Sequence, residues 1–140
     1  MNLEECFQAG YLRKGKIEIE KINGAIGIGK NFLEKASKVF QIGQFDVALL
    51  MAYTSMFHSA RALLFKDGIT ERSHFCMLLY LKEKFKEQME ISNYLSIVDS
   101  YRSIRHKIQY SGEGCSEADA SEAIKSADGF LKEVKKLSEG

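Results

Sequence analysis

The sequence predicts an all-α fold, an antiparallel up-and-down bundle of four to five main helices with a short helix at the N-terminus. Proline, the strongest helix breaker, is absent from the 140 residues. Apolar residues recur at intervals of three and four in successive stretches joined by short links, as in antiparallel helix packing. No strand pattern is visible. We expect one domain over residues 1–140, with an N-terminal extension at 1–17 and the bundle at 18–137.

Before the central helix the pattern indicates a short helix at about 2–12, a basic turn at 13–16 and a helix over about 18–40. Glycines at 24, 27 and 29 lie in the last of these. Gly29-Lys30 superficially resembles a phosphate-binding loop, but Asn31 stands where that loop needs a hydroxyl, and no strand precedes it. We interpret the glycines as places of close helix approach or of a kink.

The segment Phe45–Lys66 is the helix around which the others are expected to pack. Only Asp46, His58, Arg61 and Lys66 in it can carry charge, and apolar or small residues occupy nearly every face. That pattern is typical of a helix enclosed by other helices. A membrane span is the competing interpretation, but His58 and Arg61 lie deep in the segment and no second span follows. We therefore expect a core helix of a soluble protein and no membrane contact.

Three more helices are expected after the core helix. Ser73 is a suitable N-cap for the first, in which Phe75 is assigned to the buried side. Ser116 and the acids that follow it favour the start of the last. The expected ranges are 73–88, 92–109 and 116–137.

Composition excludes a generally basic nucleic-acid binder and gives no sign of a metal centre. Lys and Arg number 20 against 19 for Asp and Glu, so a nucleic acid would need a local patch. Cys6, Cys76 and Cys115 are widely spaced, which predicts reduced thiols and neither metal nor cofactor. The N-terminus is acidic where a signal peptide would be basic, so we expect a cytoplasmic protein.

The most informative chemistry lies in the helix at 92–109. Arg102, Arg105, His106 and Gln109 are spaced at i, i+3, i+4 and i+7 and share one outward stripe, with Asp99 one turn earlier. Arginine binds phosphate oxygens in a bidentate manner, and histidine moves protons near neutral pH. The alternative is a solvated face with an Asp99–Arg102 pair and no function. On the buried side of this helix we place Ile104.

The other two histidines are not site candidates on this pattern. His58 is expected to be a hydrogen-bonded interior or interfacial residue, and His74 a surface or capping-region residue. Arg61 is expected to keep its charged end in water at the end of the core helix.

The core segment, together with Ser73-His74, closely resembles the HEPN family (higher eukaryotes and prokaryotes nucleotide-binding). The stretch Arg102-Ser-Ile-Arg105-His106 followed by Tyr110 is similar to a later motif of that family. The resemblance covers roughly residues 34–137 and implies an all-α bundle that is usually dimeric. The matching core positions are Gly43, Phe45, Ala48, Ala52, Tyr53, Met56, Phe57, His58, Ala60, Arg61, Ala62, Leu63 and Leu64.

In many members of this family an Arg followed after four to six residues by a His forms a metal-independent endoribonuclease site across the dimer. Here only three residues separate Arg102 from His106, and the chain instead fits a branch with the pattern R-x-x-R-H-x-x-x-Y. Other members partner a nucleotidyltransferase and carry an adenylylated tyrosine two residues after the histidine. In this chain that position is Ile108, so the role does not carry over to Tyr110.

The leading hypothesis is a HEPN-type homodimer that binds nucleotide or RNA phosphate and works with a nucleotidyltransferase-family partner in a toxin–antitoxin or accessory role. The alternatives are a metal-independent endoribonuclease, with His106 as general acid/base and Arg102 and Arg105 stabilising the phosphate, and a structural interaction domain without ligand. The predicted ligand-binding residues are Arg102, Arg105, His106, Gln109 and Tyr110.

Overall fold

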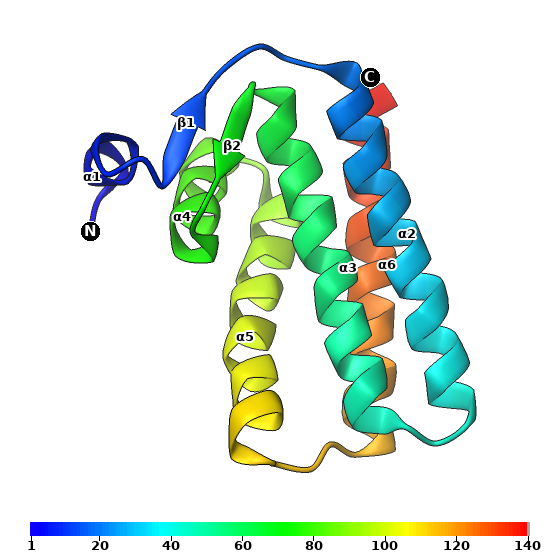
Figure 1. Cartoon of the computed structure of the whole chain (residues 1–140). Helices are drawn as coiled ribbons and strands as arrows, with labels where there is room; N and C mark the ends of the chain where they lie inside the picture. Colours follow the sequence, from blue (N-terminus) through cyan, green and yellow to red (C-terminus); the bar gives the residue numbers. More distant parts are fainter. Residues whose placement is uncertain (140) are drawn as a thin grey trace.

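Helices make up almost all of the regular structure, as the sequence predicts. The computed structural model describes residues 1–139 and confirms the all-α bundle with a short N-terminal helix (Figure 1). In chain order its elements are α1 (Leu3–Gln8), β1 (Leu12–Lys14), α2 (Ile19–Gln41), α3 (Phe45–Lys66), β2 (Ile69–Glu71), α4 (His74–Lys84), α5 (Met89–Ser111) and α6 (Glu117–Glu139).

Helix α3 is the centre of the bundle and has the predicted bounds, Phe45–Lys66. It packs against α2 and α6 along much of its length and against α4 and α5 elsewhere (Figure 1). Within the described residues it alone is long and apolar enough to cross a membrane, and 61% of its most apolar window is buried inside the bundle. Burial of this kind is typical of a core helix, because the neighbouring helices take the place of lipid.

Gly29 explains how α2 approaches α3 closely. The Ser55 hydroxyl donates a hydrogen bond to the Gly29 carbonyl oxygen at 2.7 Å. A Cβ at Gly29 would lie 3.3 Å from both the Ser55 carbonyl oxygen and the Ser59 hydroxyl oxygen, tighter than ordinary packing. The interpretation as a close-approach glycine is therefore confirmed at Gly29, whereas Gly24 and Gly27 face open space.

A small antiparallel sheet was not predicted. β1 pairs with β2 in the register Leu12↔Glu71 and Lys14↔Ile69, so part of the expected basic turn is a strand. α1 correspondingly ends at Gln8 rather than near Leu12. Two strands of three residues are too short for an alternating pattern to show in the sequence, and it is their mutual pairing that forms them.

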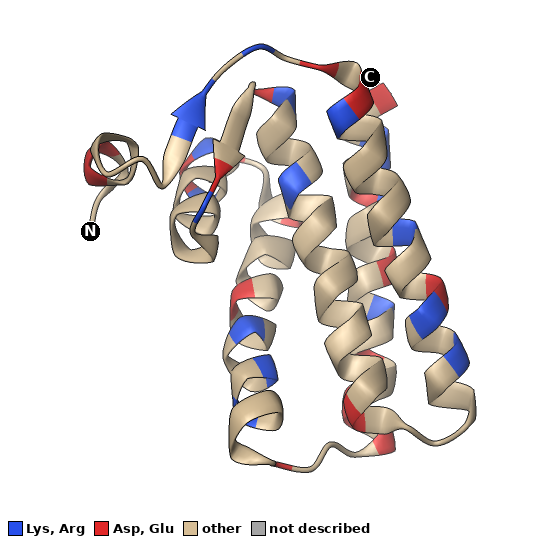
Figure 2. Cartoon of the chain, in the orientation of Figure 1, with Lys and Arg blue, Asp and Glu red and all other residues tan. Residues whose placement is uncertain are grey.

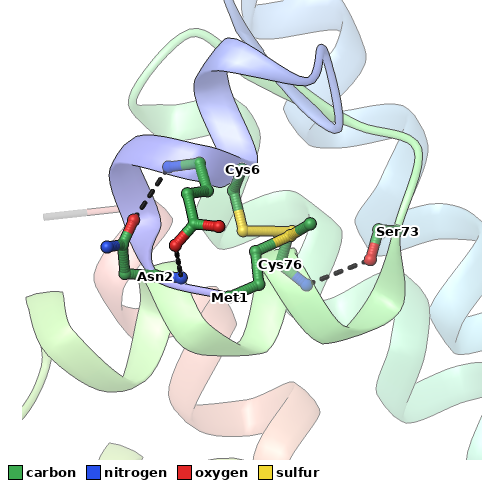
Figure 3. The surroundings of a disulfide bond; sticks show 6 residues. Met1, Asn2, Cys6, Ser73 and Cys76 are labelled. Carbon is green, nitrogen blue, oxygen red and sulfur yellow. Dashed lines mark hydrogen bonds between the residues drawn. A yellow bond between two sulfur atoms is a disulfide. The ribbon is translucent and has the colours of Figure 1, made fainter.

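The prediction of three reduced thiols is wrong for two of them. Cys6 of α1 and Cys76 of α4 form a disulfide, with 5.8 Å between their Cα atoms, and Cys115 is free. Figure 3 shows the bond holding α1 against α4, close to the end of α4 that Ser73 caps. The two cysteines are 70 residues apart in the chain, so only the packing of α1 on α4 brings them together.

The helix boundaries after α3 differ modestly from those expected. Ser73 caps α4 as predicted, since its hydroxyl accepts the Cys76 N–H at 3.2 Å. Phe75 and Ile104, both assigned to buried sides, are instead 45% and 39% exposed. Helical periodicity assigned both to an apolar side, but no neighbouring element covers that side at these two positions.

Candidate functional site

The second half of α5 is the least covered part of the main helices. All fully buried residues of α5 lie in its first half, namely Ile91, Leu95 and Val98. Figure 2 shows basic residues following one another along the second half of α5. Arg102 and Arg105 are half-buried there and Lys107 is exposed, so the charged groups remain partly accessible to a ligand.

A cleft of about 470 Å³ lies between the start of α4 and the second half of α5. The predicted Arg102, Arg105 and His106 all line it, so the structure brings these three together. Among the described residues that line the cleft none is acidic. The remaining lining residues are Ser73, His74, Phe75 and Ser103.

The predicted Asp99–Arg102 pair is present and extends to a third residue. Arg102 Nε lies 3.3 Å from Asp99 Oδ1, and Lys82 Nζ of α4 lies 2.7 Å from Asp99 Oδ2. Burial works to raise the pKa of Asp99, but the hydrogen bonds and charges of Lys82 and Arg102 outweigh it and hold that pKa below its usual value. Asp99 therefore stays ionised and orients Arg102 at the edge of the cleft.

Arg105 is held by an aromatic ring rather than by an acid. Its guanidinium carbon lies 5.2 Å from the centre of the Tyr53 ring of α3, and Nη1 donates to Gln109 Oε1 at 3.4 Å. Its Nε is buried and has no hydrogen-bond partner among the described residues. Stacking on a ring face fixes a guanidinium without neutralising it, so Arg105 keeps both its charge and free donors.

His74 is the first residue of α4, directly after the N-cap Ser73, so its assignment to the capping region is confirmed, but it also lines the cleft. It is half-buried, its ring stacks on Phe57 with centroids 4.1 Å apart, and its Nδ1 lies 3.2 Å from the Tyr53 hydroxyl. Burial lowers the pKa of His74, and the positive charges of Arg105, Arg102 and Arg61 lower it further. A neutral His74 that accepts the Tyr53 hydrogen at Nδ1 carries its own proton on Nε2.

The sequence signal for His74 was present but incomplete. Ser73-His74 belongs to the stretch that carries the family resemblance, yet nothing in the local pattern places the start of α4 beside Arg102 and Arg105. Burial also raises the pKa of Tyr53, partly offset by the charges of Arg105 and Arg102, so its hydroxyl stays protonated beside His74.

His58, expected to be interior or interfacial, is half-buried on α3 and does not line the cleft. It stacks on Phe32 at 6.0 Å and meets Phe57 edge-on at 5.2 Å. The predicted hydrogen bond is absent, since His58 Nδ1 is buried without a partner among the described residues. Arg61, one turn later, forms an ion pair with Glu71 of β2 at 2.7 Å.

Gln109 and Tyr110, also predicted as ligand-binding residues, do not line the cleft but contact residues that do. Gln109 accepts from Arg105, and the Tyr110 ring lies 4.8 Å from the ring of His106. No group of three or more His, Cys, Asp and Glu side chains that could hold a metal ion is found among residues 1–139.

Comparison with known proteins identifies relatives of this chain. A model of the HEPN domain matches residues 24–137. A protein of Methanocaldococcus jannaschii named as a "putative toxin" is 27% identical over 122 residues, which cover 84% of this chain and 88% of that protein. The matched region includes all of α3, α4 and α5, and with them every residue that lines the cleft.

Proposed function

This chain belongs to the HEPN domain family, and we propose that it is a toxin-like module that binds a phosphate of RNA or of a nucleotide between α4 and α5. The observation that carries the proposal is the convergence of Arg102, Arg105, His106 and His74 on one cleft without a lining acid. The name of the archaeal relative supports the toxin role.

The chemistry of each lining group suits a phosphate. Among the described residues Arg105 donates only to Gln109, through Nη1, and Arg102 only to Asp99, through Nε, so both guanidinium groups keep further donors. Planar guanidinium groups bind phosphate oxygens in a bidentate manner, and charged hydrogen bonds of this kind are about twice as strong as neutral ones. A neutral His74 adds a donor without adding charge repulsion between it and the arginines.

Binding of a labelled oligoribonucleotide, followed by fluorescence anisotropy over a series of salt concentrations, tests the proposal. Arg102→Ala and Arg105→Ala are each expected to weaken binding about tenfold or more and to reduce the salt slope by about one. Arg13→Ala, at an exposed position of β1 outside the cleft, is the matched control and should bind like the parent protein. Equal affinity of all four proteins would contradict the proposal.

A ribonuclease activity is the second candidate, favoured by the presence of two imidazoles, His74 and His106, in the same cleft. One could take the proton from a ribose 2′-hydroxyl and the other give a proton to the leaving 5′-oxygen, while the arginines stabilise the phosphate. Labelled single-stranded RNA incubated in EDTA should then yield fragments ending in a cyclic phosphate, and His106→Ala should abolish them. If the RNA stays intact, the ribonuclease candidate is excluded and phosphate binding remains the proposed function.

We further propose a homodimer that acts with a nucleotidyltransferase-family partner in the cytoplasm, on the family resemblance carried by α3 and α5. Light scattering tests the dimer, and a strict monomer would exclude a site shared across an interface. Co-expression with a nucleotidyltransferase encoded beside this chain tests the partner. Failure of the two proteins to co-purify would remove the two-component role while leaving the phosphate site intact.

A further inference from the structure

Exposed aromatic side chains are concentrated around the cationic cleft. The chain has 9 Phe and 6 Tyr, yet the exposed ones are only Tyr11, Phe75 and Tyr110 among the described residues. Phe75 lines the cleft itself, and Tyr110 packs on His106, which lines it too. A large aromatic ring gains favourable free energy when it is removed from water, so two exposed rings at one site need an explanation.

The two rings lie on different elements, Phe75 on α4 and Tyr110 on α5, and the arginines share α5 with Tyr110. Phe75 lies in the first turn of α4, beside His74. Tyr110 lies one turn beyond His106 on α5, 67% exposed, with its ring tilted 45° to the imidazole. Arg102 and Arg105 lie in the preceding turns of α5. The site therefore offers charge for a phosphate and, next to it, two flat apolar surfaces.

Cationic side chains next to exposed aromatic rings are typical of proteins that bind single-stranded nucleic acid. Single-stranded nucleic acid presents bases that stack on aromatic side chains, whereas the bases of a duplex are already stacked on each other. We propose that the cleft binds single-stranded RNA, with one phosphate at Arg102 and Arg105. Of the two nucleotides joined by that phosphate, one stacks its base on Phe75 and the other stacks its base on the His106–Tyr110 pair. This inference rests on the proposed phosphate site and adds the class of ligand.

The test compares three probes of equal charge in the anisotropy assay: a single-stranded oligouridylate, its abasic counterpart and an RNA duplex of the same phosphate count. The parent protein should bind the oligouridylate at least tenfold more tightly than the other two. Phe75→Ala and Tyr110→Ala should each weaken oligouridylate binding about tenfold, with unchanged affinity for the abasic strand and unchanged salt slope. Tyr11→Ala, 41% exposed and outside the cleft, is the matched control.

The outcomes separate this inference from the proposed function. If the arginine variants lose affinity for every probe while Phe75→Ala and Tyr110→Ala bind like the parent protein, the stacking surfaces are wrong and the phosphate site stands. Equal affinity for the oligouridylate and the duplex would also overturn the inference. If the parent protein binds no probe, the phosphate site fails and the inference fails with it.

Discussion

Helices α3 and α5 are nearly equal in length, 22 and 23 residues, but the rest of the protein covers them to very different extents. Twelve residues of α3 are buried, spread along the helix, whereas α5 has three, all in its first half. Packing therefore constrains the sequence of α3 almost everywhere. The second half of α5 is free of that constraint, and it is there that arginine and histidine side chains face a cleft.

The difference teaches that the helix at the centre of the fold and the helix that contributes most of the candidate site are separate elements. α3 nevertheless contributes to the site, because the Tyr53 ring contacts the guanidinium of Arg105 and the Tyr53 hydroxyl hydrogen-bonds with His74. Changes in α3 should act mainly on stability, and changes in the second half of α5 mainly on binding.

The largest expected effect comes from removing apolar volume from α3. Leu63→Ala, at a fully buried position, should lower the free energy of unfolding by about 2–5 kcal/mol through lost burial and the cavity that remains. Ile104→Ala, on the uncovered half of α5, should change it by less than about 0.5 kcal/mol. Urea unfolding measures both. A similar decrease in the free energy of unfolding in both variants would contradict the idea that packing constrains α3 more than the second half of α5.

Next in size is the disulfide that ties α1 to α4. The double variant Cys6→Ala, Cys76→Ala should lower the free energy of unfolding by about 2–4 kcal/mol, because the bond restricts the unfolded chain. Cys115→Ala is the control, with a smaller effect expected at a free, partly exposed thiol. Thiol titration of the unfolded protein should find one reactive thiol before reduction and three after it. Three before reduction would contradict the bond.

A smaller effect is expected from pH, through His58 and His74. The folded state lowers both pKa values, by burial and by neighbouring positive charge, so the unfolded chain binds protons more readily. Stability should be complete above the ordinary histidine pKa of about 6.5 and fall as the pH drops from there through the lowered folded-state values. The double variant His58→Gln, His74→Gln should flatten this dependence, as measured by thermal unfolding. A parent protein equally stable at pH 7 and pH 5 would show that the two histidines do not titrate as expected.

The smallest change in stability is expected at Asp99, where binding is the more sensitive measurement. Asp99→Asn removes the carboxylate that engages Lys82 and Arg102, and exposed ion pairs of this kind contribute under about 1 kcal/mol to folding. Both cations then lack their anionic partner, so affinity for an oligoribonucleotide should rise about two- to fivefold. Glu133→Gln removes a similar ion pair on α6, away from the cleft, and serves as the control. Weaker binding by Asp99→Asn would mean that orientation of Arg102 outweighs its charge.

Much of the fold was accessible from the sequence because its signals are local. The bounds of α3 follow from a stretch in which apolar or small residues occupy nearly every face, and the cap at Ser73 from the preference of serine for that position. Arg102, Arg105 and His106 were found together because helical spacing places them on one stripe. The family, too, could be recognised from residues along α3 and α5.

Other features depend on contacts between residues far apart in the chain. The Cys6–Cys76 disulfide joins α1 to α4, the β1–β2 pairing joins residues 12–14 to 69–71, and the cleft brings His74 of α4 beside Arg102 and Arg105 of α5. Local periodicity also misplaced Phe75 and Ile104, since it tells which side of a helix is apolar and not whether another element covers it.

The sequence by itself determined the helices, the central position of α3 and the cationic stripe of α5, since each depends on residues within a few turns of one another. Only the tertiary structure decided what faces that stripe: a cleft closed on one side by His74 and Phe75, with Tyr53 beneath. The physical reason is that a helix presents its side chains by its own geometry, whereas a binding site is formed by the surfaces of several elements packed together.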